Sequence, residues 1–304
     1  MIPGAKVWID GAVVDGALAR VSVFDHGLLY GDGIFEGMRV YSGRVFRRSD
    51  HLRRLAVSAK AIGLVFPDDV DLEAVIDDTV AAFGKDDAYI RLLVTRGEGP
   101  LSVDPTKCTR SRVICIIGEV SLYPAEKLEA GVDVVTVSLR RPRPDVLEPR
   151  VKSLNYLNNA LAILEARRAG ADEALLLNED GCVAEASGAN VFTVRDGVVA
   201  TPPTTDGALE GVTRRTLLEV CARDGFPAEE RRMTRIDLLA ADEVFLVGTG
   251  ARMVPVRTLD GALIGTPRAV APATGSPEAP HRPIYARLSA AYEACVRAHD
   301  GESC

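Results

Sequence analysis

The sequence predicts a two-domain fold of the α+β class. The chain has 304 residues, 47% of them hydrophobic and 26% charged, which is typical of a globular protein with room for more than one core. Strand and helix patterns are mixed along it, without the regular strand–helix–strand repeat of a doubly wound fold. A proline-containing stretch separates strong strand patterns. We therefore predict a small N-terminal domain over 1–118, an interdomain linker over 119–130 and a large C-terminal domain over 131–304.

The first domain is predicted to combine strands with two helices. Alternating residues flank an Asp-Gly turn over 5–14, which indicates a β-hairpin. A glycine-rich stretch over 25–33 leads into a strand over 34–41. Apolar spacing and capping residues, Ser49 or Asp50 for the first helix, predict the rest. These elements are helices over 51–62 and 72–83 and strands over 88–95 and 112–118.

The second domain is predicted to be richer in strands. Its strand patterns occur at 132–140, 173–180, 183–194, 198–202 and 244–248. Its helices are predicted over 155–168, 211–223 and 284–298. Residues 266–283 are rich in proline and alanine, so we expect a surface loop there.

Composition excludes several classes of protein. The net charge is −7 with no basic tract, so no nucleic-acid partner is expected. No apolar run approaches the roughly 20 residues of a membrane span. The N-terminus lacks the apolar stretch of a signal peptide, and we expect a cytoplasmic protein. The six cysteines show no Cys-x-x-Cys pair, so we predict thiols and no metal site.

Two residues could carry nucleophilic and acidic chemistry. Lys152 precedes an apolar helix, and burial would lower its pKa and make the amine a nucleophile. Glu185 is flanked by small and apolar residues, where a carboxylate could keep a pyridine nitrogen protonated. On these residues alone, a solvated lysine and a carboxylate at a hairpin rim are the more common outcomes.

Three further features could bind an anion. The sequence 210–213 begins a helix, whose free backbone N–H groups favour negative charge. The turn 248–250 is small enough for close approach to a phosphate or carboxylate. Arg53 and Arg54 point in different directions on a helix, so one of them could bind an anion bidentately. An ordinary helix cap and a solvated arginine pair are the alternatives.

The order of these features is more specific than any one of them. The motifs are FDHGLLYGDGIFEGMRVY, HLRRL, YIRLLVTRG, VKSLNYLN, VAEASGANVF, TPP, LEGVTRR and GTGARMVPV. Together, from about residue 6 to 265, they resemble the fold-type IV pyridoxal-phosphate enzymes, and most of all the branched-chain amino acid aminotransferases. The resemblance implies a D-amino acid aminotransferase-like fold, with a small α/β domain and a larger β-barrel-like domain. It also implies pyridoxal 5'-phosphate as cofactor.

The resemblance also implies the cofactor contacts. Lys152 matches the lysine that binds the cofactor covalently and moves a proton between Cα and C4′. Glu185 matches the acid at the pyridine nitrogen, and Arg54 the phosphate-binding arginine. The remaining positions are Tyr156 near the phenolic oxygen, Leu209 under the ring, and Val212, Thr213 and Thr249 at the phosphate.

For the substrate, the family pattern points to both domains. Tyr30, Phe35 and Gly37 match residues around the side-chain pocket, and Tyr89 and Arg91 match residues near the carboxylate and the distal acid of glutamate. The turn at Thr249 and Gly250 matches the amides that hold the substrate carboxylate. A neighbouring subunit completes this pocket in the family, which implies a homodimer or a higher homo-oligomer.

The implied reaction is transamination of L-leucine, L-isoleucine and L-valine with 2-oxoglutarate, giving branched-chain 2-oxo acids and L-glutamate. The alternatives of this fold are a D-amino acid or (R)-amine transaminase and an aminodeoxychorismate lyase. A non-catalytic relative would be expected to lack Lys152 or Glu185. Arg252 stands where the family often has an acidic residue, so it either favours an acidic substrate or faces solvent.

Overall fold

The computed structural model describes residues 2–265 and 282–297, so most of the predicted loop 266–283 lies outside the described residues. The chain divides into two compact units. Unit 1 contains the residues up to Ser121 and the short segment Val151–Tyr156, and unit 2 contains Leu122–Arg150 and Leu157–Cys295. The segment Val151–Tyr156 thus belongs to unit 1, although residues of unit 2 precede and follow it in the sequence.

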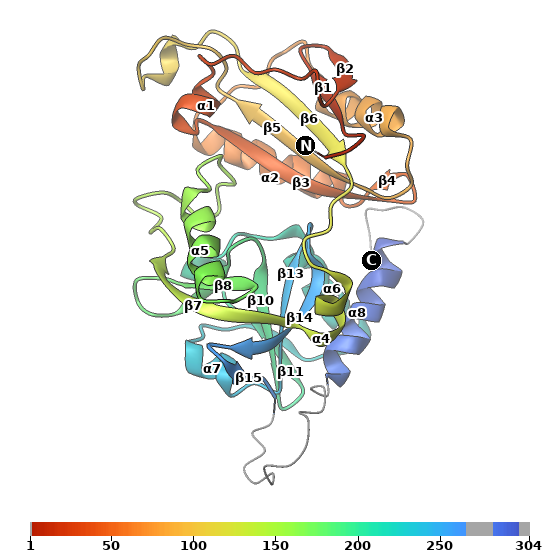
Figure 1. Cartoon of the computed structure of the whole chain (residues 1–304), viewed down its shortest axis with the longest axis vertical. Helices are drawn as coiled ribbons and strands as arrows, with labels where there is room; N and C mark the ends of the chain where they lie inside the picture. The colour runs from red at the N-terminus through yellow and green to blue at the C-terminus, as the bar shows by residue number, and fades with distance from the viewer. Residues whose placement is uncertain (1, 266–281, 298–304) are drawn as a thin grey trace. The chain divides into compact units, whose positions relative to one another are not determined.

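Unit 1 is built on an antiparallel sheet covered by helices (Figure 1, red to yellow). The strand order is β2 (Ala12–Asp15), β1 (Lys6–Ile9), β6 (Arg112–Gly118), β5 (Ala88–Thr95), β3 (Gly33–Tyr41) and β4 (Arg44–Val45). The helices are α1 (His26–Tyr30), α2 (Arg48–Ala61) and α3 (Leu72–Phe83), followed by the short η1 (Pro105–Lys107). The core of this unit joins β3, β5 and β6 to α2 and α3.

Most elements predicted for unit 1 are confirmed, and α3, β5 and β6 have the predicted bounds. The predicted hairpin is β1–β2, whose turn residues Asp10 and Gly11 both have positive φ, as a two-residue hairpin turn requires. The prediction missed α1, which begins with Asp25 as its N-cap. Neither Ser49 nor Asp50 caps α2, because the helix already begins at Arg48.

Strand β3 presents two chemically different faces. Side chains alternate along a strand, so Ile34, Glu36 and Met38 share one face, and Phe35 and Gly37 share the other. Ile34 and Met38 are fully buried in the core against the helices, and Glu36 is also fully buried. One face of β3 therefore contributes to the core, and the carboxylate of Glu36 is buried on this face.

The segment Val151–Tyr156 extends the sheet of unit 1 along one edge of β3. The Phe35 N–H donates to the Lys152 carbonyl at 2.9 Å, and the Leu154 N–H donates to the Gly33 carbonyl at 2.9 Å. Ile34 and Ser153 form the antiparallel bridge between these bonds. The backbone of Lys152 is thus fixed against β3 by ladder hydrogen bonds.

Unit 2 is built on a nine-stranded mixed sheet that curls into a half-barrel (Figure 1, green to blue). The strand order is β12 (Ala228–Glu230), β11 (Val198–Thr201), β10 (Asn190–Arg195), β13 (Glu243–Gly248), β14 (Arg252–Leu259), β7 (Val132–Arg140), β8 (Glu173–Leu177) and β9 (Val183–Ala186), and β15 (Ala262–Leu263) pairs with β14. The helices are α4 (Ala125–Ala130), α5 (Leu157–Arg168), η2 (Thr204–Asp206), α6 (Val212–Asp224), α7 (Arg235–Leu239) and α8 (Pro283–Val296).

One expectation for unit 2 needs correction. The predicted strand over 183–194 is two strands, β9 and β10, because the backbone bends at 187–189 between them. The helix α4 lies within the stretch 119–130. Cys108, Cys115, Cys182 and Cys221 are free thiols.

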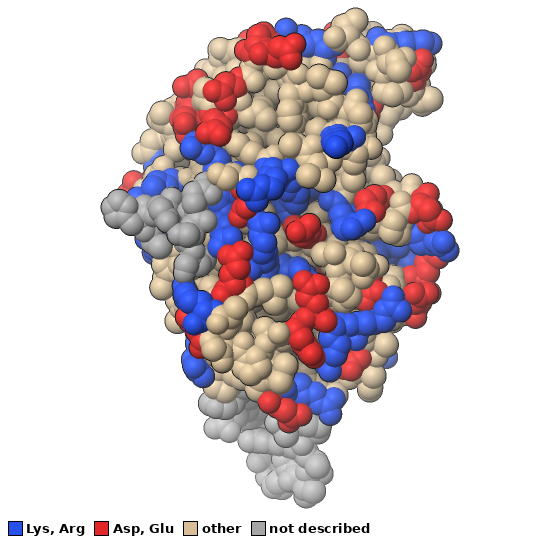
Figure 2. Space-filling model, turned by 180° about the vertical axis from the view of Figure 1, so that it is seen from behind, with Lys and Arg blue, Asp and Glu red and all other residues tan. Residues whose placement is uncertain are grey.

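No helix in the described part of the chain is long and apolar enough to cross a membrane. Surface charge is mixed, and the face in Figure 2 carries Lys or Arg and Asp or Glu side chains next to one another. Exposed ion pairs of the surface include Arg143–Asp145 and Arg110–Asp69. Within 2–265 and 282–297, no cluster of three or more His, Cys, Asp or Glu side chains could hold a metal ion.

Candidate active site

Lys152 is half-buried among aromatic side chains of unit 1. Its Nζ donates to the Tyr156 hydroxyl at 3.0 Å and lies 4.5 Å from the centre of the Phe35 ring. The rings of Phe35 and Tyr156 pack edge to face at 4.8 Å. The amine is therefore placed by a hydroxyl and two ring faces, on a backbone that the ladder with β3 fixes.

Arg91 also contacts the Phe35 ring. Its guanidinium is 4.7 Å from the centre of the Phe35 ring, and its Nη2 donates to the Tyr89 hydroxyl at 3.1 Å. Its buried Nε has no hydrogen-bond acceptor among the described residues. Buried donors normally find a partner, so this N–H suits an anionic ligand.

Gly37 makes room for the Tyr89 hydroxyl. Gly37 pairs with Arg91 across β3 and β5, and a Cβ at Gly37 would lie only 2.1 Å from the Tyr89 oxygen. Only glycine allows the phenol to cross β3 at this point. Unit 1 therefore brings together six predicted residues: Lys152, Tyr156, Phe35, Gly37, Tyr89 and Arg91. Tyr30 instead packs its ring edge to face against His26 at 4.9 Å.

Arg54 forms a two-point ion pair with the buried Glu36. Arg54 Nε donates to Oε1 and Nη2 donates to Oε2, both at 2.7 Å. His51 Nδ1 lies 2.7 Å from the same Oε2. Burial opposes ionisation of Glu36, but the charge and hydrogen bonds of Arg54 hold the pKa of its carboxyl well below the usual range. Burial lowers the pKa of His51, the charge and hydrogen bond of Glu36 oppose this shift, and the charges of Arg54 and Lys152 add to it.

Glu185 is the corresponding buried carboxylate of unit 2. It lies on β9 and receives Arg141 Nη2 at 2.7 Å, the Leu209 N–H at 2.9 Å and Asn190 Nδ2 at 3.1 Å. Arg141 is also buried, and its remaining hydrogen bonds reach the Gly207 carbonyl and Asn159 Oδ1. The orientation of Glu185 is therefore fixed from several elements.

The start of α6 has the features of an anion site. Its N-cap Gly211 provides no side-chain cap, and the first turn contains no acidic residue. The first N–H groups of a helix have no intrahelical acceptor, and Val212 and Thr213, which are buried, occupy this turn. A Cβ at Gly211 would lie 2.1 Å from Asn190 Oδ1, so the close packing of Asn190 against the start of α6 requires glycine at this position.

The turn between β13 and β14 contains Thr249 and Gly250, both half-buried. The antiparallel pair Gly248–Arg252 closes it. Arg252 is neither fully solvated nor fully buried, and its Nη1 lies 3.5 Å from Glu293 Oε1 on α8. The cation at this unusual position is thus paired with a carboxylate of the same unit.

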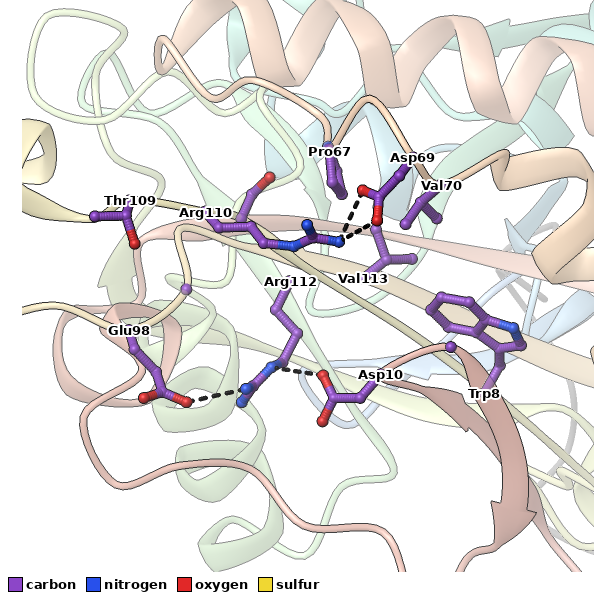
Figure 3. A pocket seen from close by; sticks show the side chains of 13 residues that line it. Trp8, Asp10, Pro67, Asp69, Val70, Glu98, Thr109, Arg110, Arg112 and Val113 are labelled. Carbon is purple, nitrogen blue, oxygen red and sulfur yellow. Dashed lines mark hydrogen bonds and ion pairs between the residues drawn. The ribbon is translucent and has the colours of Figure 1, made fainter.

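A separate cavity of about 510 Å³ lies on unit 1 (Figure 3). Its charged side chains pair with one another: Arg110 with Asp69 at 2.7 Å, and Arg112 with Asp10 at 3.2 Å and Glu98 at 3.0 Å. It shares no lining residue with the predicted site. Its cations therefore already have counter-ions, and we do not assign the site to it.

Sequence reasoning missed Glu36, His51, Arg141 and Asn190. A signal existed for the first two. Glu36 stands at a core position of a predicted strand, and His51 precedes Arg54 by three residues, which places both on one helix face. Arg141 gave no such signal, since its partner Glu185 is 44 positions away.

Comparison with known proteins identifies the family of the chain. The family model described as amino-transferase class IV matches residues 33–259. A protein of Methanocaldococcus jannaschii, whose own assignment as a branched-chain-amino-acid aminotransferase is provisional, is 46% identical, over 85% of this chain and 89% of the relative. The Escherichia coli K12 branched-chain-amino-acid aminotransferase is 36% identical, over 86% and 87%.

Solved structures give the same result. The T.th. branched-chain amino acid aminotransferase complexed with N-(5'-phosphopyridoxyl)-L-glutamate matches with a TM-score of 0.85 and 34% identity, over 96% of this chain and 94% of that chain. The predicted fold class, enzyme class and cofactor are confirmed.

The residues present suit the cofactor. An amine, a buried carboxylate, an arginine and an uncapped helix start are the groups that an aldehyde, a pyridine nitrogen and a phosphate require. The chain belongs to the amino-transferase class IV family and is a fold-type IV aminotransferase that uses pyridoxal 5'-phosphate.

Proposed function

We propose that the chain transfers amino groups from L-leucine, L-isoleucine and L-valine to 2-oxoglutarate, giving branched-chain 2-oxo acids and L-glutamate. The observation that carries this proposal is the position of Phe35, whose ring centre lies 4.5 Å from the Lys152 amine and 4.7 Å from the Arg91 guanidinium carbon. The ring offers apolar surface to a branched hydrocarbon, and the Arg91 guanidinium beside it offers positive charge to the distal carboxylate of 2-oxoglutarate. Both substrates could then use the same pocket.

Lys152 is proposed to be the catalytic base. The cofactor, when bound, supplies an electron sink that stabilises negative charge at the substrate Cα. The Lys152 amine takes the proton from the substrate Cα and would return it to C4′ of the cofactor, and the Tyr156 hydroxyl keeps the amine in place.

The remaining proposed roles are binding and orientation. Glu185 would accept a hydrogen bond from the protonated pyridine nitrogen, and Leu209, whose N–H donates to Glu185, would contact the ring. Arg54, Val212, Thr213 and Thr249 hold the phosphate. Tyr30, Gly37 and Tyr89 border the substrate, and the amides at Thr249 and Gly250 hold its α-carboxylate.

We also propose a homodimer or a larger homo-oligomer. Leu28, Leu101 and Val103 of unit 1 are 64%, 76% and 79% exposed, and Leu157 of unit 2 is 69% exposed. Exposed apolar side chains of this size support a contact with another chain.

The function is tested with an enantiomer-paired panel of amino donors and 2-oxoglutarate as acceptor. We expect turnover with the L-forms of leucine, isoleucine and valine, measured as glutamate formed. Turnover restricted to D-amino acids or (R)-amines would replace the proposed function with that of a different fold-type IV transaminase.

Lys152→Ala should abolish transamination and leave the cofactor bound non-covalently. Since positioned acid–base groups contribute about 10²- to 10⁴-fold, kcat should fall at least about 10²-fold. The absorbance band of the lysine-bound cofactor should disappear as well. Lys85→Ala, which removes an exposed lysine paired with Glu119, is the control. Turnover retained by the Lys152 variant would remove this residue from its role.

Arg91→Met should impair the reaction with 2-oxoglutarate more than the reaction with L-leucine. A hydrogen bond to a charged group contributes about 1.5–3 kcal/mol, so kcat/KM for 2-oxoglutarate should fall roughly 10- to 100-fold. The half-reaction with L-leucine, followed by single-turnover absorbance, should fall much less. Arg110→Met removes an exposed arginine and should change neither. Equal losses for both substrates would show that Arg91 does not bind the distal carboxylate.

Gly37→Ala should impair substrate turnover without weakening cofactor binding, because its Cβ would displace Tyr89 and, through it, Arg91. A displacement near 1 Å lowers kcat/KM by up to about 10²-fold. Tyr89→Phe removes the closest clashing atom, so the double variant should be more active than Gly37→Ala alone. A fully active Gly37→Ala enzyme would contradict the packing described here.

A further inference from the structure

Glu36 is a carboxylate in a position that normally holds an apolar side chain. It lies on the core-facing side of β3, between Ile34 and Met38, and all three are fully buried. A buried charge is costly unless it is paired and hydrogen-bonded. Its partners, Arg54 and His51, both come from α2. A core carboxylate with this specific pairing calls for a reason beyond packing.

The pairing fixes the plane of the Arg54 guanidinium. Two parallel N–H···O bonds of 2.7 Å define both the position and the rotation of the group, which a single bond would not. His51, one turn earlier on α2, holds the carboxylate from its other side through Oε2. Arg54 is therefore immobilised before any ligand binds.

The helix that carries Arg54 is also tied to the lysine segment. The Lys152 N–H donates to Ser58 Oγ at 3.3 Å, and Ser58 lies one turn after Arg54 on α2. The charge of Lys152 also acts on His51. Arg54 and Lys152 thus share one local framework within unit 1.

We propose that Glu36 is a positioning residue that pre-orients Arg54 for the cofactor phosphate, with His51 holding Glu36 in place. This inference rests on the proposed function, in which Arg54 binds the phosphate. A free arginine side chain would lose its rotamer freedom when the phosphate binds, whereas here that entropy is lost on folding. Coulomb's law opposes the arrangement, because a carboxylate beside a phosphate site repels the phosphate. The proposal therefore requires that orientation outweighs repulsion.

The test uses the full chain and two ligands, pyridoxal 5'-phosphate and pyridoxal, which lacks the phosphate. The ratio of their dissociation constants measures how much the phosphate contributes to binding. Glu36→Gln keeps the shape of the side chain and only one acceptor oxygen. We expect this variant to lower the ratio about tenfold, which corresponds to about 1.4 kcal/mol, and to leave pyridoxal affinity nearly unchanged. An unchanged or increased ratio would overturn the proposal.

Arg54→Ala separates this inference from the proposed function. If Arg54→Ala leaves the ratio unchanged, Arg54 does not bind the phosphate, and both claims fail. If Arg54→Ala lowers the ratio and Glu36→Gln does not, only the positioning role fails. In the Arg54→Ala background, Glu36→Gln should cause no further loss, because the residue that it positions is gone.

Asp32→Asn is the matched control for a merely structural effect. Asp32 binds Arg96 through two bonds of 2.9 and 3.0 Å, also in unit 1 and also largely buried. We expect this control to reduce stability without changing the ligand ratio. If Glu36→Gln does not fold, Arg54→Lys replaces it, since lysine keeps the charge and loses the fork. A ratio close to that of the unmodified chain in Arg54→Lys would show that orientation is unnecessary and overturn the proposal.

Discussion

The backbone pairing of Val151–Tyr156 with β3 is the interaction on which the rest of the site in unit 1 depends. Two ladder hydrogen bonds, from Phe35 to Lys152 and from Leu154 to Gly33, join residues more than a hundred positions apart. These bonds fix the register of Lys152 relative to β3, and the register determines that its amine contacts the Phe35 ring. A shift of one residue would turn the side chain to the other face of the strand.

β3 then separates two environments with its alternating side chains. On one face Phe35 and Gly37 border the amine and Arg91, and on the other Ile34 and Met38 complete the core. Glu36 is the exception on the core face. Because Glu36 is paired with Arg54, the strand that carries Phe35 and Gly37 of the proposed substrate pocket also fixes the residue proposed to bind the phosphate.

Much of the fold and part of the site follow from the sequence. Local patterns were sufficient for α3, β5 and β6, where apolar periodicity and capping agree. They failed at α2, whose N-cap Arg47 adopts a left-handed conformation with no side-chain cap. The order of motifs indicated Lys152 and Glu185. Their partners differ in this respect, because Tyr156 belongs to the same motif as Lys152, VKSLNYLN, whereas Arg141 lies outside the motifs and 44 positions from Glu185.

Glu36 and Glu185 are both buried and paired with an arginine, but the two pairs have different roles. Each is a buried carboxylate that an arginine neutralises at 2.7 Å, and each has further polar partners. At Glu36 the carboxylate serves to orient the cation, Arg54. At Glu185 the cation, Arg141, serves to orient the carboxylate. Burial makes an unpaired member of either pair costly, so the folded chain holds each group in one geometry before substrate arrives.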